Sequence, residues 1–263
     1  MKELIISIFV VLILISCTKE ILTKSAEDLS ANTKGGTPCA NLVDGVYQYP
    51  KSDSGTINLF EYDNLPEEIC NCITTEGLVE TCLNYPDWVF ITFEGKGFQS
   101  GYEVLRNNFR GFKALEKRSD AANVLITKYK LTDPYGYDST WSINQIGSLN
   151  LKLYYMTIFL GQDSIIKKET KEEKTEIIPK FLFRYNNFLE HEQDSVFPLY
   201  LRGAFFTIAR MMYFDNYQPF IVEYNKNVDL QNAIKYSGTI DNPSLKQLII
   251  SWTKDYLTVL NSK

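Results

Sequence analysis

The sequence predicts an all-α protein, either a multi-helix bundle or an array of stacked helical pairs, with an irregular N-terminal segment. Two observations indicate this fold class. Several segments repeat apolar residues at helical spacing, and residues typical of helix N-caps stand before them. In addition, no Asn-Gly or Asp-Gly turn joins two alternating runs, which is the pattern of a β-hairpin.

Composition narrows the function classes. The 263 residues are 44% hydrophobic and 22% charged, as in ordinary globular domains. The formal net charge is −5, and a mildly acidic chain lacks the basic footprint of a nucleic-acid-binding protein. We therefore expect no nucleic-acid partner.

The N-terminus has the features of an export signal. Met1-Lys2-Glu3 precedes an apolar stretch over 4–15 that is too short to cross a bilayer as a stable helix. Leu14-Ile15-Ser16-Cys17 resembles a bacterial lipobox, which implies that residues 1–16 are a signal peptide and that Cys17 becomes the lipid-bearing N-terminus. The alternative is a short membrane anchor that stays uncleaved.

The residues after Cys17 indicate where the lipid would hold the protein. Thr18 stands at the position where an Asp resembles an inner-membrane retention signal, so the outer membrane is favoured, with the body facing the periplasm or the cell surface. Residues 17–38 are rich in Ser, Thr, Lys, Asn and Gly and predict a flexible tether. We expect a single helical domain over 39–263.

The first part of this domain predicts three shorter helices. These are a helix that starts at Thr74 or Thr75 and ends at Tyr85, one over 120–130 that Ser119 caps, and one over 149–160. Residues 148–153 alternate in polarity and could form a strand instead.

Thr170 and Glu173 form a capping-box pattern that opens a longer helix. Pro179 lies inside it and is expected to kink or divide it, because proline removes a backbone donor. The charge run over 167–176 is neutral overall and is most simply the solvated face of the helix start.

The two remaining helices are the clearest. Residues 199–214 are apolar nearly all round, which is typical of a central helix. Within it, Arg202 and Arg210 could meet an acidic partner or ligand, or reach solvent or an internal carboxylate. The last helix follows Asp241 or Asn242 as N-cap and continues to Leu260 along one apolar face.

Four cysteines would remain after lipidation, namely Cys39, Cys70, Cys72 and Cys82. A bond between Cys70 and Cys72 would be strained, so a disulfide framework would pair Cys39 with one of them and Cys82 with the other. Equally, Cys82 could be a free thiol in the core. A metal site is disfavoured, because the spacing differs from that of zinc ribbons.

No catalytic signature occurs in the sequence. His191 is the only histidine, and neither a zinc-protease spacing nor a nucleophile-elbow pattern accompanies it. We expect His191 to lie at a helix C-terminus beside solvated carboxylates. The sequence therefore predicts no cofactor and no metal, and favours a non-enzymatic protein.

Aromatic residues offer the best candidates for binding. Tyr135, Tyr137 and Trp141 lie in a loop-like segment outside any helical periodicity, so we expect them to form an exposed cluster. Together with the anchor and tether, this cluster predicts a scaffold that binds a protein or peptide partner at the cell envelope. The alternative is a lipoprotein that binds a solute or a glycan.

Two motifs carry a resemblance to known proteins. The segments DGVYQYP over 44–50 and TEGLVETCLNYP over 75–86 resemble a family of uncharacterised exported proteins and lipoproteins of Bacteroidetes-type bacteria. The likeness covers about 43–130. It implies export and a helical body, and because that family has no assigned activity it transfers no functional site.

Overall fold

A computed structural model describes residues 38–49, 64–89, 91, 97–135, 140–191, 198–236 and 242–262. Helices make up most of these residues, and the only extended pairing among them is a single bridge between Val43 and Val46. The all-α prediction is therefore confirmed. The predicted signal peptide and Cys17, with the tether up to residue 37, lie outside the described residues, and Pro38 begins the described part.

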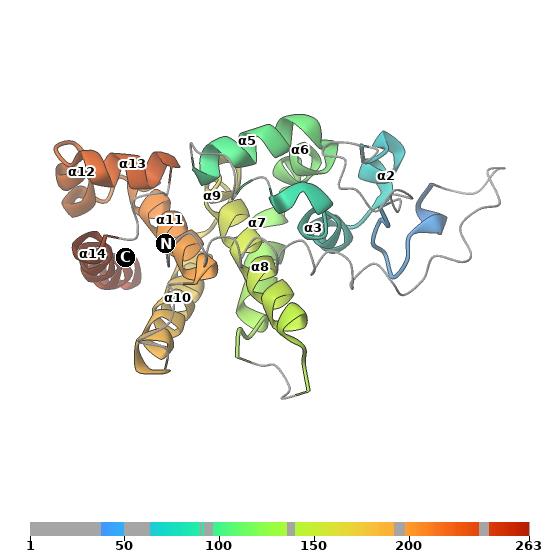
Figure 1. Cartoon of the computed structure of the whole chain (residues 1–263). Coiled ribbons are helices and arrows are strands. Elements are labelled where there is room, and N and C mark those ends of the chain that lie inside the picture. The colour runs from blue at the N-terminus through green and yellow to red at the C-terminus, as the bar shows by residue number, and fades with distance from the viewer. Residues whose placement is uncertain are drawn as a thin grey trace.

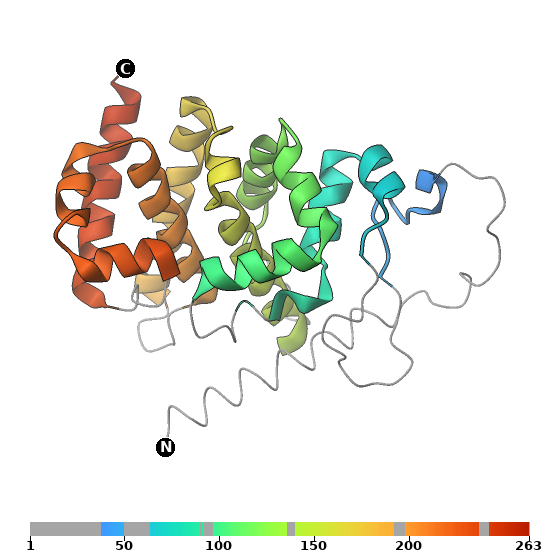
Figure 2. The ribbon, with the colours of Figure 1, turned by 90° about the horizontal axis from the view of Figure 1, so that it is seen from above.

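Figures 1 and 2 show the helices following one another from α2 at one end of the body to α12, α13 and α14 at the other. The elements are η1 Pro38–Asn41, α2 Glu67–Cys72, α3 Thr75–Leu83, η2 Pro86–Val89, α5 Phe98–Asn108, α6 Arg110–Lys117, α7 Ala121–Leu131, α8 Ile143–Leu160, α9 Asp163–Ile166, α10 Lys171–His191, α11 Leu199–Phe214, α12 Gln218–Tyr224, α13 Val228–Tyr236 and α14 Pro243–Asn261. Within the described part of the chain, no helix combines the length and the apolarity needed to cross a membrane.

The pair α8 and α11 forms the centre of the body, as the apolar composition of 199–214 predicts. The two helices approach closely at Gly203, where an added Cβ would lie 2.0 Å from Thr157 Oγ1. Beside it, the hydroxyl of Thr207 donates to the carbonyl of Thr157 at 2.5 Å. The possible strand over 148–153 is instead part of α8, because burial against α11 needs a helical face rather than an alternating one.

Helix N-termini follow the local sequence closely. In α10, Thr170 Oγ1 accepts from the amide of Glu173 at 3.1 Å, and the Glu173 carboxylate accepts from the amide of Thr170 at 2.7 Å. This reciprocal capping box confirms the prediction. Thr74 and Asn242 likewise accept backbone N–H groups at the starts of α3 and α14.

Three helix C-termini are capped by basic side chains from a later part of the chain. Each cation donates to the C-cap carbonyl and to a carbonyl two or three residues earlier, where the helix leaves acceptors unpaired and carries partial negative charge. The groups are Arg118 with Cys70 and Ile73 of α2, Lys168 with Glu116 and Arg118 of α6, and Arg184 with Tyr129 and Thr132 of α7. These contacts join helices that the sequence separates by about 45 residues or more.

The first described segment docks on α3 through a tight turn. Asp44 and Gly45 both have positive φ, 50° and 76°, and Val43 and Val46 exchange two backbone hydrogen bonds across them. Gly77 of α3 faces this turn, and a Cβ there would lie 2.2 Å from the carbonyl oxygen of Gly45. The Asp-Gly pair therefore does form a hairpin turn, of the kind that needs two residues with positive φ, although its strands are a single bridge.

One expected N-cap is wrong, and of the two alternatives for Pro179 the division of the helix does not occur. Helix α7 begins at Ala121 with Asp120 at the N-cap position, and Ser119 does not cap it. The Asp120 side chain accepts from the hydroxyl of Thr75 at 2.8 Å, so it links two helices instead. Helix α10 is not divided at Pro179, because that residue lies on its exposed face, where water can satisfy the carbonyl that loses its helical donor.

Several charged residues over 167–176 cap a helix or are buried, which the sequence does not predict. Lys168 caps α6, and the side chains of Glu169 and Lys174 are buried. The interpretation as a simply solvated face is therefore wrong for these three residues, because the sequence cannot show that Lys168 meets the end of α6 or that Glu169 and Lys174 lie near Asp215 at the end of α11.

Candidate functional site

Three exposed apolar side chains flank the connection between α7 and α8. Leu131 ends α7 and is 81% exposed, Ile143 begins α8 and is 73% exposed, and Trp141 between them is 37% exposed. Figure 1 shows that this connection projects at one end of the two helices. We call Leu131, Trp141 and Ile143 the tip surface.

Arg184 of α10 binds the C-terminal end of α7, from which the tip surface starts. Its side chain is fully buried, and its guanidinium carbon lies 3.9 Å from the centre of the Tyr129 ring. Nη2 donates to the Tyr129 carbonyl at 2.8 Å and also to the Thr132 carbonyl. Since Thr132 directly follows Leu131, the buried guanidinium fixes the backbone from which the tip surface starts.

The environment of Arg184 explains how a buried cation is tolerated. The α7 C-terminus offers two carbonyls and the negative end of the helix dipole, and the Tyr129 ring offers its electron-rich face. Burial raises the pKa of Tyr129 to about 12, while Arg184 lowers it, so the phenol stays neutral. Of the three guanidinium nitrogens, only Nη2 has hydrogen-bond partners among the described residues, since Nε and Nη1 are buried without one.

Local hydrogen bonds hold the rest of the connection. Asp133 Oδ1 accepts from the amide of Tyr135 at 3.0 Å, and the Tyr135 hydroxyl lies 3.3 Å from that of Tyr200 on α11. At the other side, Ser142 and Gln145 form a capping box that starts α8 directly before Ile143. The exposed residues thus stand at the ends of well-capped helices.

One charge beside the tip is paired. Lys130, next to Leu131, forms an ion pair with Glu176 of α10 at 2.5 Å. An apolar centre with an aromatic residue is typical of the core of a protein–protein interface.

The predicted aromatic cluster is only partly described. Trp141 is exposed, whereas Tyr135 is half-buried with its hydroxyl at Tyr200, and Tyr137 lies outside the described residues. A binding role for these residues stays a prediction. Sequence reasoning missed Leu131 and Ile143, although both fall outside the apolar helical periodicity of their segments, which is the signal that could have found them.

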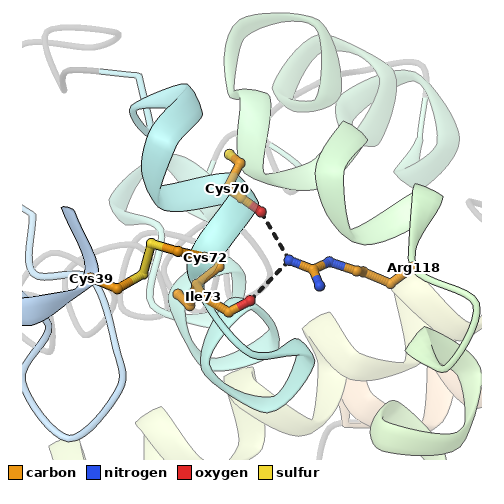
Figure 3. Close-up of a disulfide and its surroundings, with 5 residues drawn as sticks. All are labelled: Cys39, Cys70, Cys72, Ile73 and Arg118. Atoms are coloured by element: carbon orange, nitrogen blue, oxygen red, sulfur yellow. Dashed lines mark hydrogen bonds between the residues drawn. A yellow bond between two sulfur atoms is a disulfide. The ribbon is translucent and has the colours of Figure 1, made fainter. Parts of the chain in front are cut away.

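The cysteines form one disulfide. Among the described residues, Cys39 of η1 is bonded to Cys72 of α2, with Cys70 beside the bond as a free thiol (Figure 3). Cys82 of α3 is also a buried free thiol. The interpretation with two disulfides is therefore wrong, and the interpretation of Cys82 as a free core thiol is confirmed. Figure 3 also shows Arg118 donating to the carbonyls of Cys70 and Ile73, each at 2.9 Å, beside this bond.

The two thiols are poorly suited to chemistry. Burial raises the pKa of Cys70. The pKa of Cys82 is raised well above its usual value, mainly by burial and to a smaller extent by the neighbouring Cys70. A thiol with a raised pKa is a weak nucleophile and a weak metal ligand at neutral pH. The described residues also hold no cluster of three or more His, Cys, Asp or Glu side chains that could bind a metal ion.

The remaining candidate residues from the sequence are Arg210, Arg202 and His191. Arg210 pairs with the exposed carboxylate of Asp163 at 2.6 Å and also reaches Gln99, so its partner carboxylate belongs to the chain but lies at the surface. Arg202 lies close enough to Tyr154 to influence the pKa of that phenol. His191 is the last residue of α10, as expected for a helix C-terminus.

Comparisons with known proteins add no relative. No protein-family model, no curated protein and no solved structure matches the chain.

Proposed function

We propose that the chain is a lipid-anchored protein of the bacterial cell envelope whose non-enzymatic helical domain binds a protein or peptide partner through the tip surface. The observation that carries the proposal is the exposure of Leu131 and Ile143, 81% and 73%, at the ends of two capped helices. Apolar side chains that are exposed together on a fixed backbone mark interaction sites more often than single exposed residues do.

The rigidity of the site supports this function. Arg184 and the Ser142 capping box fix the two helix ends, so a partner would not have to order them on binding. Leu131, Trp141 and Ile143 would supply the apolar contact, with Trp141 as the aromatic anchor.

A binding experiment tests the role of the tip. We expect Ile143→Asp to weaken the binding of a captured envelope protein at least tenfold, because a charge would be buried at the interface centre. The protein is captured on the immobilised chain, and its affinity for the purified wild type and variants is then measured by interferometry.

The matched control is Val222→Asp, which places the same charge at an exposed valine of α12, away from the tip. Equal weakening by both substitutions, or unchanged binding in Ile143→Asp, contradicts the proposal. Binding of a glycan that Trp141→Ala abolishes, with no effect of Ile143→Asp on protein binding, would show that the site serves sugars.

The proposed anchor has its own test. We expect intact-mass analysis of the native protein to give a chain that starts at Cys17 and carries lipid, because the lipobox-like tetrad over 14–17 places Cys17 at the cleavage point. Cys17→Ala should leave an unprocessed or soluble form. A native mass that includes residues 1–16 rules out this part of the proposal.

A further inference from the structure

A cluster of ionisable groups lies at the junction of α9, α10, α11 and α14, in which Glu169, Lys174 and Tyr256 are buried and Asp215 is partly exposed. Glu169, between α9 and α10, is buried, and neither of its carboxyl oxygens has a hydrogen-bond partner among the described residues. Buried polar atoms are nearly always hydrogen-bonded, so a carboxyl with both oxygens unpartnered requires a physical reason.

One cation in this cluster faces two carboxyl groups. Lys174 Nζ pairs with Asp215 Oδ1 at 2.6 Å, and the lysine side chain is only 6% exposed. The Tyr256 hydroxyl of α14 donates to the other oxygen of Asp215. Asp215 therefore links α10 to α14 at the end of α11, and Lys174 is engaged away from Glu169.

The surrounding charges favour the neutral form of Glu169. Burial raises the pKa of this carboxyl to about 8; Lys174 lowers it, while Glu173 and Asp215 raise it. Tyr256, the facing group from α14, has a pKa above its usual value because of burial and Asp215. Lys168, next in sequence, donates to the carbonyls of Glu116 and Arg118 instead.

We propose that Glu169 is a proton-controlled latch between α10 and α14. When its carboxyl is neutral, Lys174 pairs with Asp215, which also accepts from Tyr256, and this holds α14 against α10. When the carboxyl is ionised, it competes with Asp215 for Lys174 and loosens that contact. The proton that Glu169 loses goes to solvent. Lys174 pairs with Asp215 and also acts electrostatically on Glu169, so an ionised Glu169 would compete with Asp215 for the same ammonium.

The direction of the pH effect follows from the proton balance. In the folded chain Glu169 keeps its proton up to about pH 8, whereas in the unfolded chain it loses the proton near its ordinary value. The folded state therefore binds more protons between these values, and stability falls as pH rises through this window. Above the folded pKa the contribution is lost entirely.

Glu169→Gln tests the latch, since an amide has the same shape and does not ionise. We expect the unfolding equilibrium constant of the wild type to rise, relative to that of Glu169→Gln, by about fiftyfold between pH 6 and pH 8, because one proton is involved and the folded carboxyl is half-ionised at pH 8. Chemical denaturation of the full chain at each pH measures this ratio. Glu172→Gln is the matched control, since Glu172 lies three residues later in the first turn of α10 and is exposed, and it should follow the wild type.

Hydrogen exchange separates a latch from a general loss of stability. Protection of α14, normalised to the unstructured rate and to α3, should fall with pH in the wild type and not in Glu169→Gln. An infrared band of a protonated carboxyl at pH 7, present in the wild type and absent from Glu169→Gln, is also expected. Parallel pH responses of the two proteins, or no such band in the wild type, overturn the proposal.

Discussion

Arg184→Leu is expected to lower the free energy of unfolding by about 4 kcal/mol, because it leaves two C-terminal carbonyls of α7 without a charged donor in a buried setting. Leucine fills much of the space, so lost packing should be the smaller contribution. Urea unfolding followed by circular dichroism measures the change.

Two variants make the result specific. Arg184→Lys keeps the charge but has a shorter side chain and lacks the planar group that covers the Tyr129 ring, so it should recover less than half of the loss. Lys226→Leu removes an exposed cation that is paired only with Glu223 and should change stability by less than about 0.5 kcal/mol. A loss for Arg184→Leu no larger than that of Lys226→Leu would show that the buried cap contributes little.

Gly203→Val is expected to lower the free energy of unfolding by about 3 kcal/mol, because its Cβ would overlap Thr157 Oγ1 at the closest approach of α8 and α11. Thermal and urea unfolding both report it. The central helix pair would have to move apart, which also disturbs the hydrogen bond from Thr207 to the Thr157 carbonyl.

A compensating substitution identifies the cause. Thr157→Ala removes the overlapping hydroxyl, so the double variant Gly203→Val with Thr157→Ala should be at least about 1 kcal/mol more stable than the sum of the single changes predicts. Strictly additive effects would place the cost of valine elsewhere in the helix.

The sequence predicts helix starts because their signals are local. The capping box of Thr170 and Glu173, and Asn242 before Pro243, lie within a few residues of the amides they cap. The apolar character of 199–214 likewise predicts the central helix. The sequence identifies only part of the tip surface. Trp141 is an obvious candidate, but the exposure of Leu131 depends on where α7 ends.

Helix ends could not be predicted, because their partners are distant in the chain. Arg184 lies 52 residues from the carbonyl of Thr132 that it caps, and nothing near Thr132 indicates it. The burial of Glu169 has the same origin, since α10 and α14 come together only in the folded chain.

The disulfide could be predicted from the sequence only in part. The sequence left Cys70 and Cys72 as equal partners for Cys39. Residues two positions apart on a helix, such as Cys70 and Cys72, point in nearly opposite directions. Only one of them can therefore face η1, while the other faces the core. In α2 the core-facing residue is Cys70, and Cys72 bonds to Cys39.

The central claim, that the tip surface binds a partner, is tested most directly by site-specific photo-crosslinking in cells that make the protein. A photoreactive residue in place of Ile143 should give a crosslinked adduct with one defined protein, and the same residue in place of Val222 should not. No adduct at 143, or the same adduct from both positions, would contradict the account.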